Sequence, residues 1–125
     1  MRILVVEDNK INQMITKKIL NKMNLVCDLV DNGEDAVEKV KEVTYDVVLM
    51  DIHMPGISGL EATKQIRALD VKRPNDLPII IIALSAHAME DYRVIAKNVG
   101  MDGFLNKPLD KEQLEKVLLN AFNSL

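Results

Sequence analysis

The stretch that decides the fold is VVLMDIHMPGISG, residues 47–59. Its first four residues are apolar, the fifth is an acid, Asp51, and a histidine, a proline and a glycine follow shortly after. A strand that is apolar throughout, rather than alternating, is typical of a parallel sheet covered on both faces. A carboxylate at the end of such a strand loses solvation and must find partners. The stretch therefore predicts a buried central strand that carries an aspartate to a polar site.

Short β-type runs recur along the chain, separated by segments with helical periodicity. The predicted strands are Ile3–Val6, Val26–Val30, Val47–Met50, Ile79–Leu84 and Gly103–Leu105. Between them, apolar residues recur at three- and four-residue spacing, as on one face of an amphipathic helix. The predicted helical stripes are Ile11, Met14, Ile15, Lys18, Ile19 and Met23; Ala36, Val37 and Val40; Leu60, Thr63, Ile66 and Leu69; and Leu114, Val117, Leu118, Ala121 and Phe122.

Two helices have end signals of their own. A shorter helix is predicted over residues 90–99, with Gly100 at the position where glycine commonly ends a helix. Asp110 and Gln113 have nearly the spacing of a capping box at the start of the last helix. Strands that alternate with single helices predict right-handed crossovers and a parallel sheet. We therefore expect an α/β fold, a doubly wound (βα)5 arrangement with a central five-stranded parallel sheet, in which residues 1–125 form a single domain.

Composition excludes several classes of protein. The formal net charge is −3 and no basic stripe is present, so direct binding to nucleic acid is not expected. No apolar run approaches the roughly 18 residues that span a membrane, and the start MRILVVEDN turns acidic too early for a signal peptide. Cys27 is the single cysteine, so no internal disulfide can form. These features predict a cytoplasmic globular protein without membrane insertion.

Polar side chains follow four of the predicted strands. Glu7 and Asp8 follow the first strand, and Asp51 follows the third. Ser85 follows the fourth strand, and Lys107 follows the fifth. Each alone has an ordinary explanation, such as a solvated turn or a helix cap. Because the carboxyl ends of parallel strands meet at one edge of the sheet, we expect the five groups to lie together at the site of a doubly wound fold.

This set of groups predicts a particular chemistry. Clustered carboxylates repel one another unless a cation intervenes, and oxygen ligands suit Mg²⁺, with Mn²⁺ as the alternative. Beside such an ion, Asp51 is a nucleophile that can accept a phosphoryl group. The ion and Lys107 would neutralise charge on the transferring oxygens. Ser85 would donate a hydrogen bond to the attached phosphoryl group.

The segments VVEDN, VVLMDIHMPGISGLE, IIALSAHA and GFLNKPL, in this order, resemble the receiver domain of two-component response regulators. The resemblance covers essentially the whole chain, and VEDNKINQ, LSAHAM and GMDGFLNKPL are most similar to receivers attached to hybrid histidine kinases. It implies the flavodoxin-like strand order 2-1-3-4-5. It also implies a signalling domain, not an enzyme, that takes a phosphoryl group from a histidine kinase or a histidine phosphotransfer domain and then changes its surface. Such a domain is cytoplasmic, by itself or as the cytoplasmic part of a larger membrane-bound kinase.

The resemblance assigns a role to each polar residue. It makes Asp51 the phosphoacceptor, which binds Mg²⁺ together with Asp8 and the backbone carbonyl of His53. Glu7 acts on the ion through water. Lys107 contacts the phosphoryl group, and the Lys107–Pro108 peptide bond is usually cis in this family.

The switch residues depart slightly from the family pattern. Ser85 is the switching hydroxyl where threonine is commoner, and Phe104 is the aromatic residue that turns inward on activation where tyrosine is commoner. Ser85 keeps the hydroxyl, whereas Phe104 lacks the phenolic oxygen. Phosphorylation of Asp51 would draw Ser85 inward and open room for the Phe104 ring.

The two histidines flank the predicted site. His53 lies two residues after Asp51, and His87 lies two residues after Ser85. In receivers these two positions tune the rate at which the aspartyl phosphate hydrolyses. Because imidazoles titrate close to neutral pH, the lifetime would also depend on pH. The alternative is that both are ordinary loop residues.

The first helix has two interpretations. Its segment NKINQMITKK, residues 9–18, would dock the helix of a histidine phosphotransfer partner through exposed apolar residues, or its stripe would be used in the core. A weak or phosphorylation-dependent dimer is also left open.

Three other functions fit the sequence less well. A flavodoxin-type cofactor binder needs a phosphate-cradling loop rich in glycine and hydroxyls after the first strand, where this chain has EDNKIN. A phosphatase of the haloacid dehalogenase type has a second aspartate where this chain has His53. A receiver-fold interaction module that is not phosphorylated usually lacks one of the acids or the lysine, all of which are present here.

Overall fold

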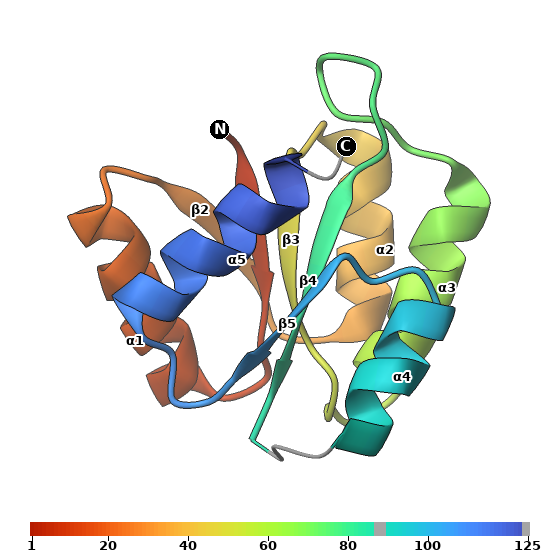
Figure 1. The fold of residues 1–125 in the computed structure, drawn as a ribbon. Helices are drawn as coiled ribbons and strands as arrows, with labels where there is room; N and C mark the ends of the chain where they lie inside the picture. The colour runs from red at the N-terminus through yellow and green to blue at the C-terminus, as the bar shows by residue number, and fades with distance from the viewer. Residues whose placement is uncertain (87–89, 124–125) are drawn as a thin grey trace.

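The computed structural model describes residues 1–86 and 90–123, except for the side chains of residues 90, 91 and 123. Strands and helices alternate along the described chain, as predicted (Figure 1). The strands are β1 (Ile3–Val6), β2 (Cys27–Val30), β3 (Val47–Asp51), β4 (Ile80–Ser85) and β5 (Gly103–Asn106). The helices are α1 (Lys10–Lys22), α2 (Gly33–Glu42), α3 (Gly59–Leu69), α4 (Glu90–Asn98) and α5 (Lys111–Asn123).

The strands form one parallel sheet in the order β2-β1-β3-β4-β5, which confirms the predicted doubly wound topology. The chain moves from β1 to β2 on one side and then crosses to β3 on the other, so the order reverses between β1 and β3. The register pairs Val6 with Met50 and Asp51 with Leu84, which brings the carboxyl ends of β1, β3 and β4 to the same edge. Doubly wound folds place their sites at such a reversal.

The strands extend further into the polar edge than the sequence indicated. Asp51 is the last residue of β3, and Ser85 is the last residue of β4, where it pairs with Asn106 of β5. At the opposite end, β2 begins at Cys27, because Val26 is 75% exposed and unpaired with β1. The two polar side chains are therefore held by the sheet itself and not by mobile loops.

Two apolar cores lie on opposite faces of the sheet. Helices α2, α3 and α4 cover one face, and α1 and α5 cover the other (Figure 1). Alternate residues of each strand serve the two cores: Leu4 and Val6 of β1 point to the first, and Ile3 and Val5 to the second. None of the helices in the described ranges is both long and apolar enough to cross a membrane.

The buried face of α1 is not the predicted apolar stripe. The buried residues of this helix are Gln13, Thr16 and Leu20. Gln13 can be buried because its side-chain amide donates to the carbonyl oxygens of Glu7, at 2.6 Å, and of Val30, at 3.4 Å. The stripe residues turned to solvent are Ile11, 71% exposed, Met14, 55%, and Ile15, 43%. The interpretation that this stripe is used in the core is wrong for these three residues, whereas Ile19 and Met23 of the same stripe pack against the core.

Side-chain caps fix where the helices begin and end. Asn9, Asn32 and Ser58 each accept a backbone N–H of the first turn of α1, α2 and α3. Asp110 accepts the N–H of Glu112 at 2.8 Å, as expected for the predicted cap of α5. Gly100 has a φ of 102°, and the amides that follow α4 return to Ala96 and Lys97, so the predicted terminal glycine is confirmed.

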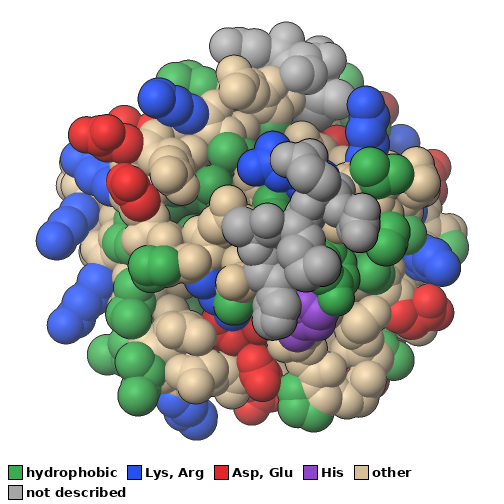
Figure 2. All heavy atoms as spheres, turned by 60° about the horizontal axis from the view of Figure 1, so that its bottom comes forward, with side chains coloured by type: hydrophobic (Ala, Val, Ile, Leu, Met, Phe, Trp, Pro, Cys, Tyr) green, Lys and Arg blue, Asp and Glu red, His purple; other side chains and the backbone are tan. Residues whose placement is uncertain are grey.

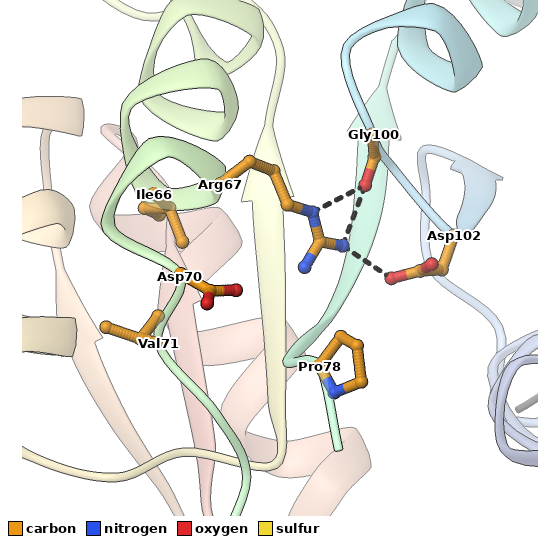
Figure 3. Close-up of a pocket in the computed structure, with 7 residues that line it drawn as sticks. All are labelled: Ile66, Arg67, Asp70, Val71, Pro78, Gly100 and Asp102. Atoms are coloured by element: carbon orange, nitrogen blue, oxygen red, sulfur yellow. Dashed lines mark hydrogen bonds and ion pairs between the residues drawn. The ribbon is translucent and has the colours of Figure 1, made fainter. Parts of the chain in front are cut away.

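A hollow of about 350 Å³ lies at the amino edge of the sheet, far from the polar edge. It is filled on one side by Arg67, whose guanidinium donates to the carbonyl oxygen of Gly100 and pairs with Asp102 at 2.8 Å (Figure 3). The guanidinium also donates to the carbonyl oxygen of Ile79. Asp102 also accepts the N–H of Ile81. Because these polar groups already satisfy one another, the hollow is a structural junction between α3, β4 and the turn before β5.

Candidate functional site

The polar groups predicted from the strand ends meet at the carboxyl edge of the sheet. Figure 2 turns this edge toward the viewer and shows acidic side chains gathered beside a histidine. Glu7 follows β1, Asp51 and Ser85 end β3 and β4, and Lys107 follows β5. The topology explains this convergence, because every strand of the sheet runs in the same direction.

Three carboxylates form the centre of the site. Glu7 is 1% exposed and Asp51 is 3% exposed, whereas Asp8 faces solvent. Each of the three offers an oxygen that lies within 4.8 Å of the other two. Two buried acids and one exposed acid therefore form an oxygen-lined pocket that opens toward solvent.

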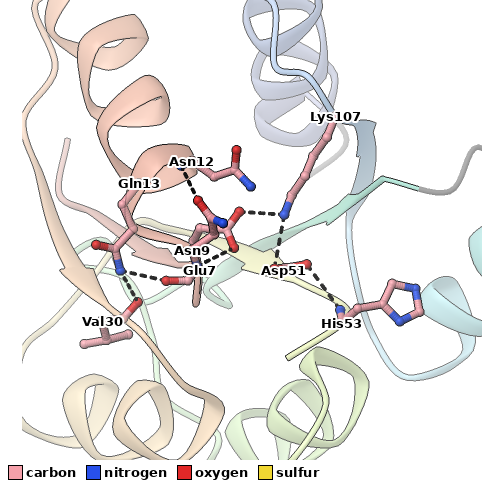
Figure 4. A network of polar contacts seen from close by, with 8 residues as sticks. All are labelled: Glu7, Asn9, Asn12, Gln13, Val30, Asp51, His53 and Lys107. Carbon is pink, nitrogen blue, oxygen red and sulfur yellow. Dashed lines mark hydrogen bonds and ion pairs between the residues drawn. The ribbon is translucent and has the colours of Figure 1, made fainter. Parts of the chain in front are cut away.

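Lys107 joins the two buried acids. Its Nζ lies 2.5 Å from Oε1 of Glu7 and 3.1 Å from Oδ2 of Asp51 (Figure 4). Burial by itself would lower the pKa of Lys107, but the hydrogen bond to Glu7 and the negative charge of Asp51 outweigh it, so the pKa is raised. The ammonium therefore stays charged and partly neutralises acids that would otherwise be buried unpaired.

Backbone amides hold the remaining carboxylate oxygens. The N–H of His53 donates to Oδ1 of Asp51 at 3.2 Å, and the N–H of Asn9 donates to Oε2 of Glu7 at 3.3 Å. The N–H of Lys107 donates to the carbonyl oxygen of Ser85 at 2.7 Å, which ties the β5–α5 loop to the end of β4. Both buried acids are thus oriented from two sides.

The donor set fits a hard divalent cation. The ligand atoms that the described residues offer are carboxylate oxygens, which Mg²⁺ prefers, with no sulfur or imidazole among them. One ammonium does not balance three carboxylates, so the pocket keeps excess negative charge. The exposure of Asp8 leaves room for the waters that Mg²⁺ retains.

His53 contributes its backbone to this site and directs its ring elsewhere. The imidazole points away from Asp51 (Figure 4). It meets the ring of Tyr92 on α4 edge-on, with 5.0 Å between the ring centroids and 85° between the planes. An imidazole so placed is not a metal ligand, and the loop after β3 is linked through it to α4. The other predicted histidine, His87, lies outside the described residues.

The two predicted switch residues lie on neighbouring strands. Ser85 is fully buried at the end of β4. Phe104, on β5, is half-buried against the core that α2, α3 and α4 cover. The Arg93 guanidinium of α4 lies 5.4 Å from the centroid of the Phe104 ring. The Lys107–Pro108 bond is cis, as the resemblance implied.

Sequence reasoning missed three contributors. Gln13 and Asn9 orient the loop that carries Glu7, and Arg93 covers Phe104. The asparagine could have been found as the N-cap before a helix. No local signal marks the other two, because a glutamine on an apolar-looking helix and an arginine on an exposed one are ordinary surface patterns.

Comparisons with known proteins agree with this geometry. The family described as the response regulator receiver domain matches residues 3–119. The sensor protein GacS of Pseudomonas syringae pv. syringae is 39% identical over 118 residues, which is 94% of this chain and 13% of that protein. The chain therefore spans a small part of the length of this relative.

Two solved structures are similar over nearly the whole chain. The receiver domain of the sensor histidine kinase PA1611 from Pseudomonas aeruginosa PAO1 is 34% identical, with a TM-score of 0.83 and 98% and 97% of the two chains covered. That structure has a magnesium ion coordinated in its active site cleft. The second is a co-crystal structure of the Saccharomyces cerevisiae histidine phosphotransfer protein Ypd1 and the receiver domain of Ssk1, with 36% identity, a TM-score of 0.84 and coverage of 93% and 84%.

The matched relatives are sensor and hybrid histidine kinases, which confirms the resemblance to receivers attached to such kinases. The family match extends over nearly every element, from β1 into α5. With its parallel sheet in the order 2-1-3-4-5 and its acids and lysine at the carboxyl edge, this chain belongs to the response regulator receiver domain family.

Proposed function

We propose that Asp51 accepts a phosphoryl group from a phosphohistidine donor and that Asp8, Asp51 and the backbone carbonyl of His53 hold the Mg²⁺ that this transfer requires, with Glu7 acting through water. The observation that carries the proposal is the position of the Lys107 ammonium between buried Asp51 and buried Glu7, beside exposed Asp8. The magnesium ion in the cleft of the PA1611 receiver supports the same choice of metal.

The transfer needs little rearrangement of this site. A carboxylate oxygen of Asp51 forms a bond to phosphorus, and the bond from phosphorus to the donor's imidazole nitrogen breaks. The electron pair of that bond stays on the nitrogen, and because the donor ring carries a proton on its other nitrogen, it leaves as neutral imidazole. A bound Mg²⁺ would neutralise charge on the phosphoryl oxygens during this step. The His53 N–H holds the Asp51 carboxylate in place throughout.

The Lys107 ammonium would shift toward the negative charge that the phosphoryl group brings to the site. Before transfer, its ammonium is shared between Glu7 and Asp51. After transfer, Asp51 has lost its carboxylate charge, and the phosphoryl oxygens replace it as strong acceptors for the ammonium, beside Glu7. A shift of the Lys107 side chain toward the phosphoryl oxygens would pull on the β5–α5 loop. The pull would also reach the end of β4, because the backbone N–H of Lys107 donates to the carbonyl oxygen of Ser85.

Ser85 and Phe104 would transmit the effect of Asp51 phosphorylation to the protein surface. The Ser85 hydroxyl would turn to donate to the phosphoryl group, and the Phe104 ring would enter the space beside it. That movement breaks the contact between Phe104 and Arg93, which is worth about 0.5–1 kcal/mol at an exposed position. Such a small difference suits a population shift between two packings.

The partner surface is proposed on α1. Its exposed Ile11, Met14 and Ile15 form an apolar face beside the site. Ile15 also lines a small hollow together with Lys107, Pro108 and Leu109, so the face continues to the edge of the phosphoryl pocket. A helix of a histidine phosphotransfer domain laid on this face would bring its phosphohistidine to Asp51. The Ypd1–Ssk1 co-crystal supports a partner of this class.

Phosphorylation of the Asp51→Asn variant tests the assignment. The protein is incubated with Mg²⁺ and either a phosphorylated histidine phosphotransfer domain or a small phosphodonor, and acid-labile phosphate is measured. Asp51→Asn should take up none. Asp46→Asn is the matched control, because Asp46 lies just before the first residue of the same strand, where it accepts the N–H of Arg2. Unchanged phosphate incorporation in Asp51→Asn overturns the assignment.

A further inference from the structure

We propose that Glu34, in the first turn of α2, is a positioning residue that holds the β3–α3 loop and thereby the backbone carbonyl of His53 in its metal-binding place. The inference rests on the proposed function, because it is that proposal that gives the His53 carbonyl to the metal. Glu34 itself touches neither phosphoryl group nor ion.

The β3–α3 loop, residues 52–58, is fixed at its base by the sheet. The N–H of Ile52 donates to the carbonyl oxygen of Leu84 at 3.0 Å, and the N–H of Gly59 donates to that of Ile52 at 2.9 Å. The first bond ties the start of the loop to β4, and the second joins the two ends of the loop. They leave the tip, which includes Gly56 and Ile57, to be held by something outside the loop.

Glu34 supplies that contact from a distant part of the chain. Its Oε1 accepts the N–H of Ile57 at 2.8 Å, across 23 positions of sequence. Helix α2 can present it there because Asn32 caps the helix by accepting the N–H of Asp35 at 2.7 Å, which fixes the first turn beside the loop. Among the described residues, Glu34 takes part in no ion pair, so its carboxylate is not drawn to a competing cation.

Two glycines, Gly33 and Gly56, allow the start of α2 and the tip of the loop to come close enough for this hydrogen bond. A Cβ added to Gly33 would lie 2.6 Å from Cγ1 of Ile57, so the start of α2 and the loop tip approach as closely as a glycine allows. Gly56 has a φ of 79°, a conformation that side chains rarely adopt, and a Cβ there would lie 2.7 Å from Oε1 of Glu34. The tip is thus shaped to expose the Ile57 N–H to the carboxylate.

The hydrogen bond between Glu34 and Ile57 affects the metal site through the backbone that connects Ile57 to His53. The N–H of His53 donates to Asp51, so the backbone of this residue is already held beside the pocket. With the tip released, the loop would sample further conformations, and only a fraction would direct the carbonyl of His53 to the ion. The apparent dissociation constant rises in inverse proportion to that fraction. Loss of a typical net hydrogen bond corresponds to roughly a two- to tenfold change.

Mg²⁺ titration of the full chain, followed by amide chemical shifts, tests the proposal. Glu34→Ala should weaken Mg²⁺ binding by roughly two- to tenfold and shift the amide signals of Ile57 and His53 before any metal is added. Glu34→Gln should restore most of the affinity, because the carboxamide oxygen still accepts the Ile57 N–H although the charge is gone. Glu38→Ala is the control, since Glu38 lies one turn along the same helix and pairs with Lys41 at 2.9 Å. It should bind like the parent.

Three results overturn the proposal: parent affinity in Glu34→Ala, equal losses in Glu34→Ala and Glu38→Ala, or no rescue by Glu34→Gln. The last would mean that the charge of Glu34, and not its hydrogen bond, acts on the ion. Asp51→Asn is titrated alongside. If it binds Mg²⁺ as the parent does, the proposed metal site itself fails; if it loses affinity while Glu34→Ala does not, only the positioning role fails.

Discussion

Replacing Lys107 with methionine should destabilise the metal-free protein, and Mg²⁺ should repair much of the loss. Methionine keeps most of the length of the lysine side chain and removes only the ammonium. In the parent, that ammonium lies 2.5 Å from Glu7 and 3.1 Å from Asp51, and these acids are 2% and 4% exposed at their side chains. The variant leaves both buried without their cation.

The magnitude follows from the geometry. At an effective dielectric constant of about 20, unit charges at these separations attract by about 5–7 kcal/mol each. Lost hydration offsets much of that attraction, and removing one partner of a buried ion pair typically costs about 3–5 kcal/mol. The Lys107 side chain is 17% exposed, so water reaches it. We therefore expect the lower end, about 3 kcal/mol, which a domain with a stability of about 5–15 kcal/mol survives.

Urea unfolding followed by circular dichroism measures the effect with and without Mg²⁺. The difference between parent and Lys107→Met should narrow by at least about 1 kcal/mol at saturating Mg²⁺, because the ion then replaces the missing positive charge. Lys111→Met is the control: Lys111 and Glu115 are 3.9 Å apart and about half exposed, so this loss should stay below about 0.5 kcal/mol. Equal stability of the two variants without metal, or a difference that Mg²⁺ leaves unchanged, would refute the reasoning.

Two other outcomes are expected. His53→Ala should change the rate at which the Asp51 phosphate is hydrolysed, because the ring that is removed links the loop after β3 to Tyr92 of α4; a dephosphorylation rate equal to that of the parent would make the ring a bystander. Cys27 should react with a thiol reagent at pH 8 more slowly in the folded protein than in urea, because burial raises the pKa of its thiol from 9.0. A group whose pKa is higher in the folded state than in the unfolded state stabilises the fold at pH values below the unfolded pKa. That stability is lost as the pH rises through the folded pKa, so the free energy of unfolding should fall above about pH 9. Equal thiol reactivity in the folded and unfolded protein would contradict this prediction.

The sequence by itself determined the sheet and the membership of the site. Runs such as VVLM and IIIIAL are typical of strands covered on both faces, and single helices between them indicate parallel crossovers. Once the strands are parallel, Glu7, Asp51 and Lys107 must reach the same edge. That conclusion needs only the order of the elements, and for this reason it was correct without any knowledge of packing.

Which polar groups actually bond was decided by the tertiary structure. Lys107 and Glu7 are 100 positions apart, and the sequence alone did not show that the ammonium lies closer to Glu7 than to Asp51. Glu34 and Ile57 likewise meet only because α2 and the β3–α3 loop stand side by side at one edge of the sheet. Contacts of this kind depend on distances between elements, about which local sequence patterns carry no information.

The orientation of α1 shows most clearly what apolar periodicity in a sequence cannot determine. Apolar periodicity predicted a stripe through Ile11, Met14 and Ile15, yet these residues are exposed and Gln13 is buried. Periodicity weighs each residue by its hydrophobicity, but a buried amide is tolerated when its hydrogen bonds are satisfied, as Gln13 is by the carbonyls of Glu7 and Val30. Those carbonyls lie at the ends of two strands that come together only in the folded sheet. The sequence thus determined that α1 is amphipathic, and the fold decided which of its faces is buried and which is exposed.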